Sequence, residues 1–263
     1  MEQKSIKVSI IGSGNVAEHL ALAFAEAKGV ELVEVCGRNA DRVAAISQMA
    51  ECNSSNDFAA LREADIYIVS VTDRCVGEVA AMLKVPTNSI IAHTAGCVPM
   101  QVLPETARRG VFYPFQTFSM GHRLDISRVP LFIEGDNAQT HEELRALAHA
   151  ISNVVRDADS ELRRKVHLSG VFASNYVNRM YTYALRNIEE AGLGFECIAP
   201  VIEETARKCL ERQNPALLQT GPARRGDRAT IERHLQQLEH NPEVREIYRL
   251  LCEDIMREWC SEA

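Results

Sequence analysis

The feature that most constrains the fold is a glycine-rich turn near the start of the chain. Residues 6–11 are apolar and rich in β-branched side chains, which predicts a buried strand, and an amphipathic helical pattern follows the turn. Gly12, Gly14 and Ala17 form a G-x-G-x-x-A pattern, which allows a tight turn, a close backbone approach to a diphosphate and close helix–strand packing. A helix N-terminus at this position would attract an anion. The residues predicted to bind a dinucleotide diphosphate are Gly12, Ser13, Gly14, Asn15 and Val16, and the alternative is a turn that binds nothing.

The end of the next predicted strand indicates which dinucleotide would bind. An NAD-specific site usually has an acidic residue here, roughly 20 positions after the glycine pattern, to hold the ribose 2′-hydroxyl. This chain has Cys36 and Gly37 in that place, followed by Arg38 and Asn39, while Glu34 lies earlier in the strand. Because a guanidinium binds phosphate bidentately, Gly37 and Arg38 predict NADP. Asn39 could contact the phosphate or only cap the next helix.

Composition excludes several other classes of protein. The net charge is −7 over 263 residues, whereas a dedicated nucleic-acid binder is usually basic. No apolar run approaches the length of a membrane span, and the N-terminus lacks the features of a signal peptide. The eight cysteines form no C-x-x-C pair, and no His–Cys spacing suggests zinc. We therefore expect a cytoplasmic protein with reduced thiols, no metal site, and no nucleic-acid or membrane partner.

The order of the predicted elements indicates two domains. Strands at 6–11, 30–36, 65–71 and 89–92 alternate with helices at 15–28, 40–50 and 74–83, which predicts a doubly wound parallel sheet. Strands near 110–113, 129–135 and 153–157 and a helix at 139–151 extend this sheet. The rest is helical, with helices expected at 159–191, 195–211, 227–239 and 242–260. The fold class is therefore α/β followed by an all-α domain, with the domains at 1–157 and 158–263.

Polar residues at the strand ends are the next candidates. Ligands of open α/β sheets bind outside the carboxyl ends of the strands, so Ser70, Val71 and Thr72 are predicted to line the cofactor site. His93 either contacts substrate or is a structural histidine. Gln116 either lines the nicotinamide pocket or fixes a turn. Arg225 could bind a substrate carboxylate, while Asp227 is expected to cap the following helix.

The long helix at 159–191 carries an unusual polar stripe. At 100° per residue, one narrow arc holds His167, Val171, Ser174, Asn175, Asn178 and Tyr181. Neutral hydrogen-bonding groups with one imidazole suit the wall of a ligand site, because His167 could exchange a proton near neutral pH. Ser174 and Asn175 could orient a polar acceptor. These three residues are the predicted catalytic set, and the alternative is a helix–helix contact satisfied by polar pairs.

Taken together, these motifs resemble a known family. In the N-terminal half the resemblance rests on the glycine pattern, on Gly37-Arg38-Asn39, on the strand end at 93–96 and on the segment 113–119. In the C-terminal half it rests on the helix motif at 167–175 and on the loop at 220–227 with His234. The whole chain is similar to a family of NADP-dependent oxidoreductases, each with a Rossmann-like N-terminal domain and a helical C-terminal domain of unknown function. It is distantly similar to 6-phosphogluconate dehydrogenase, pyrroline-5-carboxylate reductase and ketopantoate reductase.

This resemblance implies a dinucleotide domain paired with a helical domain that supplies substrate contacts and often a dimer interface. The chain departs from several relatives at one point, because Val171 stands where they have a catalytic lysine, four residues before Asn175. His167 is then the nearest candidate for proton transfer. Apolar residues of the C-terminal helices could form a homodimer interface or a monomeric core; they are Leu235, Leu238, Ile247, Leu250, Leu251, Ile255 and Trp259.

Three functional hypotheses follow from these residues. In the first, NADPH passes a hydride to a small carbonyl or imine substrate in a cleft between the domains, His167 supplies the proton, and Ser174 and Asn175 hold the acceptor. The second is a non-catalytic NADP(H)-binding sensor or assembly protein, which the missing lysine favours. The third is hydride exchange with a flavin or deazaflavin partner.

Overall fold

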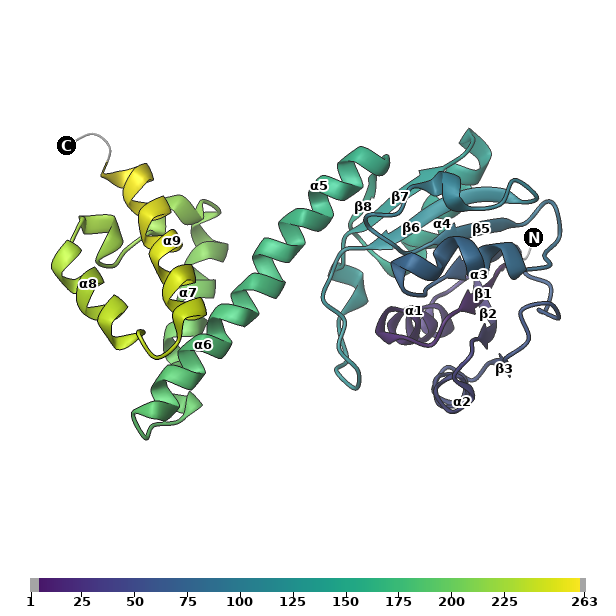
Figure 1. Cartoon of the computed structure of the whole chain (residues 1–263). Helices are drawn as coiled ribbons and strands as arrows, with labels where there is room; N and C mark the ends of the chain where they lie inside the picture. Colours follow the sequence, from purple (N-terminus) through teal and green to yellow (C-terminus); the bar gives the residue numbers. More distant parts are fainter. Residues whose placement is uncertain (1–4, 261–263) are drawn as a thin grey trace. The chain divides into compact units, whose positions relative to one another are not determined.

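The computed structural model describes residues 5–260, and its N-terminal part is built on one eight-stranded sheet (Figure 1). The strand order is β3-β2-β1-β4-β5-β6-β7-β8. Six strands run parallel: β1 (Ile6–Ile11), β2 (Val30–Cys36), β3 (Asn53–Ser55), β4 (Ile66–Val69), β5 (Ile90–His93) and β6 (Arg108–Pro114). β7 (Leu131–Gly135) pairs antiparallel to β6, and β8 (Val155–Asp157) runs parallel to β7.

Helices cover both faces of this sheet, as its buried strands require. One face packs on α1 (Asn15–Glu26), α2 (Ala40–Met49) and α4 (Ala138–Ile151). The other face packs on α3 (Val76–Met82) and the loops around it. Because both faces are covered, the central strands are continuously apolar, and β4 and β5 are buried at every position. The predicted Rossmann-like doubly wound sheet is confirmed.

The C-terminal part is helical, as predicted. Its elements are α5 (Ser160–Gly170), a π-helix (Val171–Tyr176), α6 (Val177–Glu190), α7 (Ala199–Arg212), α8 (Arg228–Gln237) and α9 (Pro242–Trp259). The chain divides into two compact units, Met1–Asn175 and Tyr176–Ala263, so the division falls inside the long helix. No helix among the described residues is both long and apolar enough to cross a membrane.

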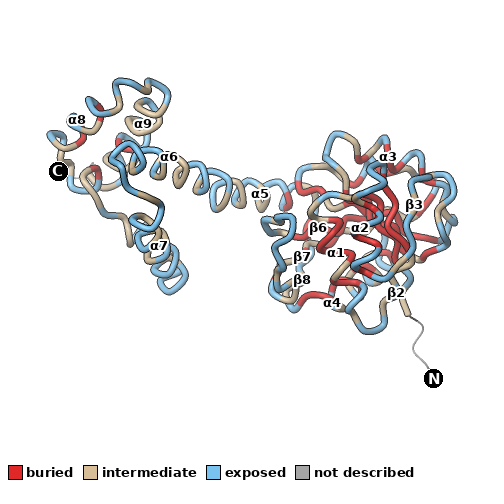
Figure 2. Tube along the Cα trace, turned by 90° about the horizontal axis from the view of Figure 1, so that it is seen from below, coloured by how far each residue is buried: buried red, intermediate tan, exposed pale blue. Residues whose placement is uncertain are grey.

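The C-terminal unit has a small core of its own. Its buried apolar residues are Ala223, Ile231, Leu235 and Cys252, whereas buried positions fill the strands of the N-terminal unit (Figure 2). Large apolar side chains remain exposed on α7, on the segment after it and on α9; they include Val201, Leu210, Leu217, Leu250 and Leu251. The predicted cap is present, because the Asp227 carboxylate accepts a hydrogen bond from Thr230 N at 3.1 Å.

Two local predictions were wrong. The sequence analysis did not include β3, a three-residue edge strand that is too short to produce a periodic pattern. It also treated 159–191 as one α-helix, but residues 171–176 form a π-helix with i→i+5 hydrogen bonds. Propensity cannot indicate such an insertion, because it is a change of hydrogen-bond partner within an otherwise helical segment.

Candidate functional site

The N-terminus of α1 is open toward the carboxyl edge of the sheet. Gly14 stands at the N-cap position, and no side chain caps this helix, whereas Asn39 and Asn137 cap α2 and α4. A Cβ built on Gly14 would meet no heavy atom within 4 Å. The first turn of α1 therefore offers backbone N–H groups and free space beside them, which is what an anionic diphosphate requires.

Gly12 makes the turn into this helix possible. Its φ is +140°, and a Cβ at this position would overlap with the carbonyl oxygen of Ser70. Backbone hydrogen bonds hold both sides of this close approach, from Gly12 N to Cys36 O and from Ser70 N to Ile11 O, each at 2.7 Å. Only glycine fits a position with this φ and this spacing.

A pocket of about 670 Å³ lies at this edge and brings the predicted cofactor residues together. Its lining includes all of them: Gly12, Ser13, Gly14, Asn15, Val16, Gly37, Arg38, Asn39, Ser70, Val71 and Thr72. It also includes Phe58, Asp73, Val79, Thr94, Ala95, Gln116 and Phe118. Phe58 and Phe118 were missed, because nothing local in the sequence indicates that their loops fold back over the strand ends. The predicted catalytic residues His167, Ser174 and Asn175 do not line this pocket.

The second strand ends without a free acid at this pocket. Arg38 is exposed, and Glu34 is buried with its carboxylate accepting a hydrogen bond from Arg62 N at 2.6 Å. Burial raises the pKa of the Glu34 carboxyl above its ordinary value. Asn39 caps α2, since its side-chain oxygen accepts from Arg42 N at 3.1 Å. At the end of this strand, the exposed Arg38 lines the pocket, while Glu34 and Asn39 are already engaged.

The loop between β6 and β7 forms one side of the pocket, and α1 anchors it. The Asn15 side chain donates to the carbonyl oxygen of Phe118 at 2.9 Å. The ring nitrogens of His19 lie 2.8 Å from the carbonyl oxygens of Asn15 and His122, and the His19 and Phe118 rings contact edge to face. Gln116 lines the pocket, and its side-chain oxygen also accepts a hydrogen bond from Thr117 N at 2.8 Å within the turn.

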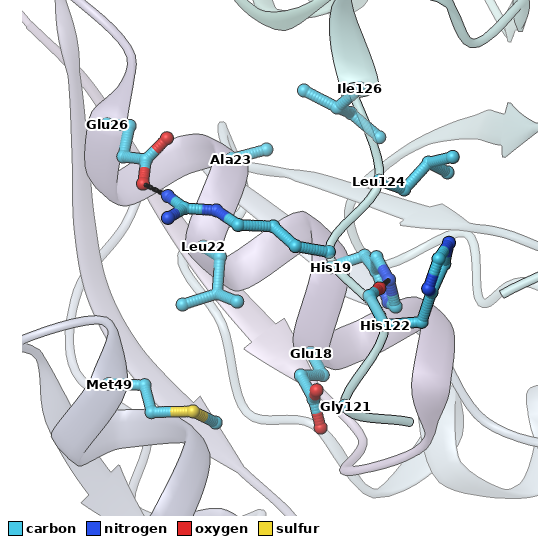
Figure 3. A pocket seen from close by; sticks show the side chains of 11 residues that line it. Glu18, His19, Leu22, Ala23, Glu26, Met49, Gly121, His122, Leu124 and Ile126 are labelled. Carbon is cyan, nitrogen blue, oxygen red and sulfur yellow. Dashed lines mark hydrogen bonds and ion pairs between the residues drawn. The ribbon is translucent and has the colours of Figure 1, made fainter. Parts of the chain in front are cut away.

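Where this loop passes α1, it leaves a second hollow of about 360 Å³ (Figure 3). α1 contributes Glu18, His19 and Glu26, α2 contributes Met49, and the loop contributes residues 121–126. An ion pair between Arg123 and Glu26 crosses it. Glu18 is engaged by Arg42 at 2.7 Å. Both acids are thus paired, and the hollow results from the way the loop is anchored.

His167 contacts the strand ends through Tyr113. The Tyr113 hydroxyl lies 3.2 Å from His167 Nδ1, and the ring centroids are 6.3 Å apart. A Cβ on Gly96 would lie 2.8 Å from His167 Nδ1 and 2.9 Å from the Tyr113 hydroxyl oxygen, so both groups contact that glycine. Gly96 directly follows Ala95, which lines the pocket. His167 is therefore separated from the pocket lining by a single backbone segment.

Arg163 fixes the helix that carries His167. It lies four residues earlier, on the same face, and is fully buried. Its guanidinium forms an ion pair with Glu134 of β7 and donates to the carbonyl oxygen of Val98 at 2.9 Å. Burial lowers the pKa of Arg163 to about 10. Sequence reasoning missed this residue, because an arginine in a basic run such as Arg163-Arg164-Lys165 near the start of a helix is usually exposed.

His93, which was considered as a substrate contact, is a structural histidine. It is fully buried, and its Nδ1 accepts from Ala95 N–H at 3.2 Å. Its Nε2 is buried and has no hydrogen-bond partner within normal geometry in the described part of the chain. Burial, with a smaller contribution from the charge of Arg163, lowers the pKa of His93 to about 4.

This shift predicts a pH-dependent stability. In the folded protein His93 stays neutral down to about pH 4, whereas in the unfolded chain its pKa is close to the ordinary value of 6.5. The neutral His93 side chain therefore contributes on the order of 3 kcal/mol to the free energy of unfolding. This contribution is fully present above pH 6.5 and is lost as the pH falls from 6.5 to 4. Urea unfolding of the wild type and of His93→Asn at pH 7, 5.5 and 4.5 measures it. Near pH 5 the unfolding free energy of the wild type should fall by about 1.4 kcal/mol per pH unit more than that of the variant. If the two proteins lost stability in parallel, His93 would not be the group responsible.

The predicted polar arc changes at the π-helix. A π-helix turns less per residue than an α-helix, which changes the angular positions of residues 171–176 around the helix axis. Asn175 therefore lies closer to the side of the helix that carries His167 than an α-helix would place it, and Ser174 lies farther from that side. Ser174 is half-buried and Asn175 is exposed. Asn178 and Tyr181 belong to the other compact unit. Single π-helical turns inside α-helices occur often at functional sites.

These observations define a class of protein. An open, mostly parallel sheet, a glycine turn, an uncapped helix N-terminus and a pocket at the carboxyl edge are the features of a Rossmann-type dinucleotide-binding protein. Across residues 5–260, no three His, Cys, Asp or Glu side chains gather where they could hold a metal ion.

Comparisons with known proteins agree with this class. The family described as "NADP oxidoreductase coenzyme F420-dependent" matches residues 7–96, and the "Domain of unknown function (DUF2520)" matches residues 129–255. A solved structure described as "putative NADP oxidoreductase BF3122 from Bacteroides fragilis" is 35% identical, with 97% of this chain and 100% of that chain covered and a TM-score of 0.87. The chain therefore belongs to the family of NADP oxidoreductases that combine these two domains. This confirms the resemblance found in the sequence.

More distant structures share the fold. The Thermotoga maritima protein TM1727 is 19% identical, with 97% of this chain and 99% of that chain covered and a TM-score of 0.73. A reductive aminase from Aspergillus terreus, solved with NADPH and ethyl-5-oxohexanoate, is 15% identical, with coverages of 97% and 94% and a TM-score of 0.69. No curated protein matches this sequence significantly.

Proposed function

We propose that the protein is an NADPH-dependent reductase of a small carbonyl or imine substrate. The observation that carries this proposal is the pocket at the carboxyl edge of the sheet, which joins the glycine turn, Arg38 and the ends of β4 and β5. The reductive aminase with the same fold was solved with NADPH and a ketone, which is in keeping with this substrate class.

The residues present fit the cofactor. The uncapped N-terminus of α1 and the open space at Gly14 suit a diphosphate, and Arg38 suits a 2′-phosphate. Gly37 packs closely at this edge, since a Cβ there would lie 3.1 Å from Val43 Cγ2 and 3.5 Å from the Ser13 hydroxyl oxygen. When bound, NADPH would supply the hydride, and the protein supplies positioning and electrostatics.

The end of the pocket near Thr94 and Ala95 is where we place the chemistry. His167 lies next to this segment and would give a proton to the oxygen or nitrogen that gains negative charge. Asn175 follows about two helical turns later, near the line of His167, and would hold the acceptor by hydrogen bonds, whereas the π-helix turns the predicted partner Ser174 away from that line. No lysine occupies position 171 to compete for the role of acid.

Replacing Arg38 with alanine tests the choice of cofactor. NADPH affinity should fall by about 10- to 100-fold, because a charge-assisted phosphate contact is lost, while NADH affinity should stay unchanged. Fluorescence titration of each protein with both nucleotides measures this. Arg38→Lys should give an intermediate loss, since lysine keeps the charge but not the bidentate geometry.

Arg145→Ala is the matched control, because Arg145 lies on α4 in an ion pair with Asp157, away from the pocket. If neither nucleotide binds, or if NADH binds as tightly as NADPH to the wild type, the proposal fails. NADPH binding without turnover on any carbonyl or imine would instead favour a non-catalytic NADP(H)-binding protein.

We further infer that the protein is a cytoplasmic homodimer. The C-terminal unit buries few side chains, and Val201, Leu210 and Leu217 are 66–79% exposed, which suits contacts with a second copy. All eight cysteines are free, which is usual for proteins in a reducing compartment.

A further inference from the structure

We infer that Tyr113 is a positioning residue for His167, and that it holds the imidazole by Nδ1 so that Nε2 carries the hydrogen that meets the substrate. This inference rests on the proposed reductase function. The motif that contains Tyr113 was noticed in the sequence, but no role was assigned to the tyrosine. Tyr113 precedes His167 by 54 positions in the sequence, and its hydroxyl oxygen lies 3.2 Å from His167 Nδ1 in the folded protein.

The direction of this hydrogen bond follows from the hydroxyl. Tyr113 is 8% exposed, and among the described residues His167 Nδ1 is the only hydrogen-bond partner of its hydroxyl. If Nδ1–H donated in the neutral ring, the hydroxyl hydrogen would have no acceptor among the described residues, which is unfavourable for a largely buried tyrosine. The O–H group therefore donates to Nδ1, and the neutral ring carries its hydrogen on Nε2.

The hydroxyl keeps its proton at neutral pH. Burial, together with the negative charges that Cys97 and Asp73 can carry, raises the pKa of Tyr113 to about 12, and the positive charge of Arg163 opposes this only in part. A protonated hydroxyl can donate to a neutral ring and accept from a charged one. Tyr113 can thus hold Nδ1 in both charge states of His167.

Packing holds both rings in place. Tyr113 contacts Phe115 and Phe132, with centroids 6.2 Å apart in each case. Gly96 leaves no room for a Cβ between Tyr113 and His167. The Arg163 anchor, one turn before His167, ties the helix to β7 and to the loop after β5. Because the ring is constrained on its Nδ1 side, only Nε2 is left for substrate, and it has no hydrogen-bond partner among residues 5–260.

The proton transfer can then be written in full. The Nε2–H bond of the charged ring breaks, and an O–H or N–H bond forms on the acceptor, to which bound NADPH would supply the hydride. The ring becomes neutral, with Nδ1–H donated to the Tyr113 oxygen. It regains a proton at Nε2 from water, which restores the charged ring, and Nδ1–H is donated to the Tyr113 oxygen throughout.

Tyr113→Phe tests this inference, since it keeps the ring and removes only the hydroxyl. In the wild type, ¹⁵N NMR of the neutral His167 ring should show Nε2 protonated and Nδ1 as a hydrogen-bonded acceptor. In the variant the Nδ1 resonance should move to the position of a free acceptor. The kcat should fall by about tenfold, the effect of one hydrogen bond, with KM and NADPH affinity unchanged.

Tyr248→Phe is the matched control, because Tyr248 pairs with His234 Nδ1 at 2.7 Å within the C-terminal unit. That variant should leave the His167 resonances and kcat unchanged. A wild-type ring protonated at Nδ1, or an Nδ1 resonance that does not respond to Tyr113→Phe, would overturn the inference even if the protein reduces its substrate. Absence of NADPH-dependent turnover would instead overturn the proposed function, while the NMR result, which needs no substrate, would still be decided.

Discussion

Replacing Gly12 with alanine is expected to lower the free energy of unfolding by about 4 kcal/mol and to abolish measurable NADPH binding. The added Cβ would overlap with the carbonyl oxygen of Ser70, and the residue would need a φ of +140°, which an alanine rarely adopts. Overpacking and backbone strain each cost about 1–3 kcal/mol. Relaxation cannot remove the overlap easily, because hydrogen bonds tie Gly12 to β2 and Ser70 to β1.

Gly14→Ala is the control that separates folding from binding. Gly14 has a φ of −82° and open space where a Cβ would project. Its unfolding free energy should therefore change by less than about 1 kcal/mol, while NADPH affinity falls, because the methyl group occupies space proposed for the diphosphate. Urea denaturation and fluorescence titration give the two quantities. If Gly12→Ala proved as stable as the wild type, the close approach of β1 and β4 described above would be incorrect.

The second large effect is expected at His167. His167→Asn should lower kcat by about 10²- to 10⁴-fold, the usual contribution of a general acid, and should leave the NADPH dissociation constant unchanged. Asparagine keeps a polar group of similar size but cannot transfer a proton at neutral pH. Steady-state kinetics with NADPH and a substrate found by screening carbonyls and imines would measure the loss.

His149→Asn is the control for this change, because His149 is an exposed histidine on α4. It should retain wild-type kinetics. Equal turnover in His167→Asn and the wild type would remove His167 as the acid, and the proton would then have to come from another group or from water. The missing lysine at position 171 makes this test decisive for the mechanism.

Much of the fold follows from local sequence signals. The glycine pattern, the apolar strand segments and the helical periodicity predicted nearly every element, and helices such as α4 and α9 lie within one residue of their predicted bounds. These signals are reliable because burial on both sheet faces makes strands apolar throughout, while one-sided burial gives helices a 3.6-residue period. That the proposed cofactor residues line one pocket was also predictable, since motif spacing places them at strand ends.

The arrangement of the proposed catalytic residues was less accessible to sequence reasoning. His167 was found from the polar stripe, but its relation to Ser174 and Asn175 depends on the π-helix at 171–176, which the assumption of 100° per residue excluded. His93 has the residue type of a functional group, yet it is fully buried and neutral. Residue type alone does not distinguish a structural histidine from a reactive one, because the difference lies in the surroundings.

The sequence by itself determined the α/β class, the glycine turn, the helical C-terminal part and the preference for Arg38 over an acid, because each depends on residues close together in the chain. Only the tertiary structure decided that Tyr113 meets His167, that Arg163 is buried against Glu134, and that β7 and β8 run opposite to the other strands. These features depend on contacts between distant segments. Their free energies come from burial and hydrogen bonds that exist only after the chain has folded.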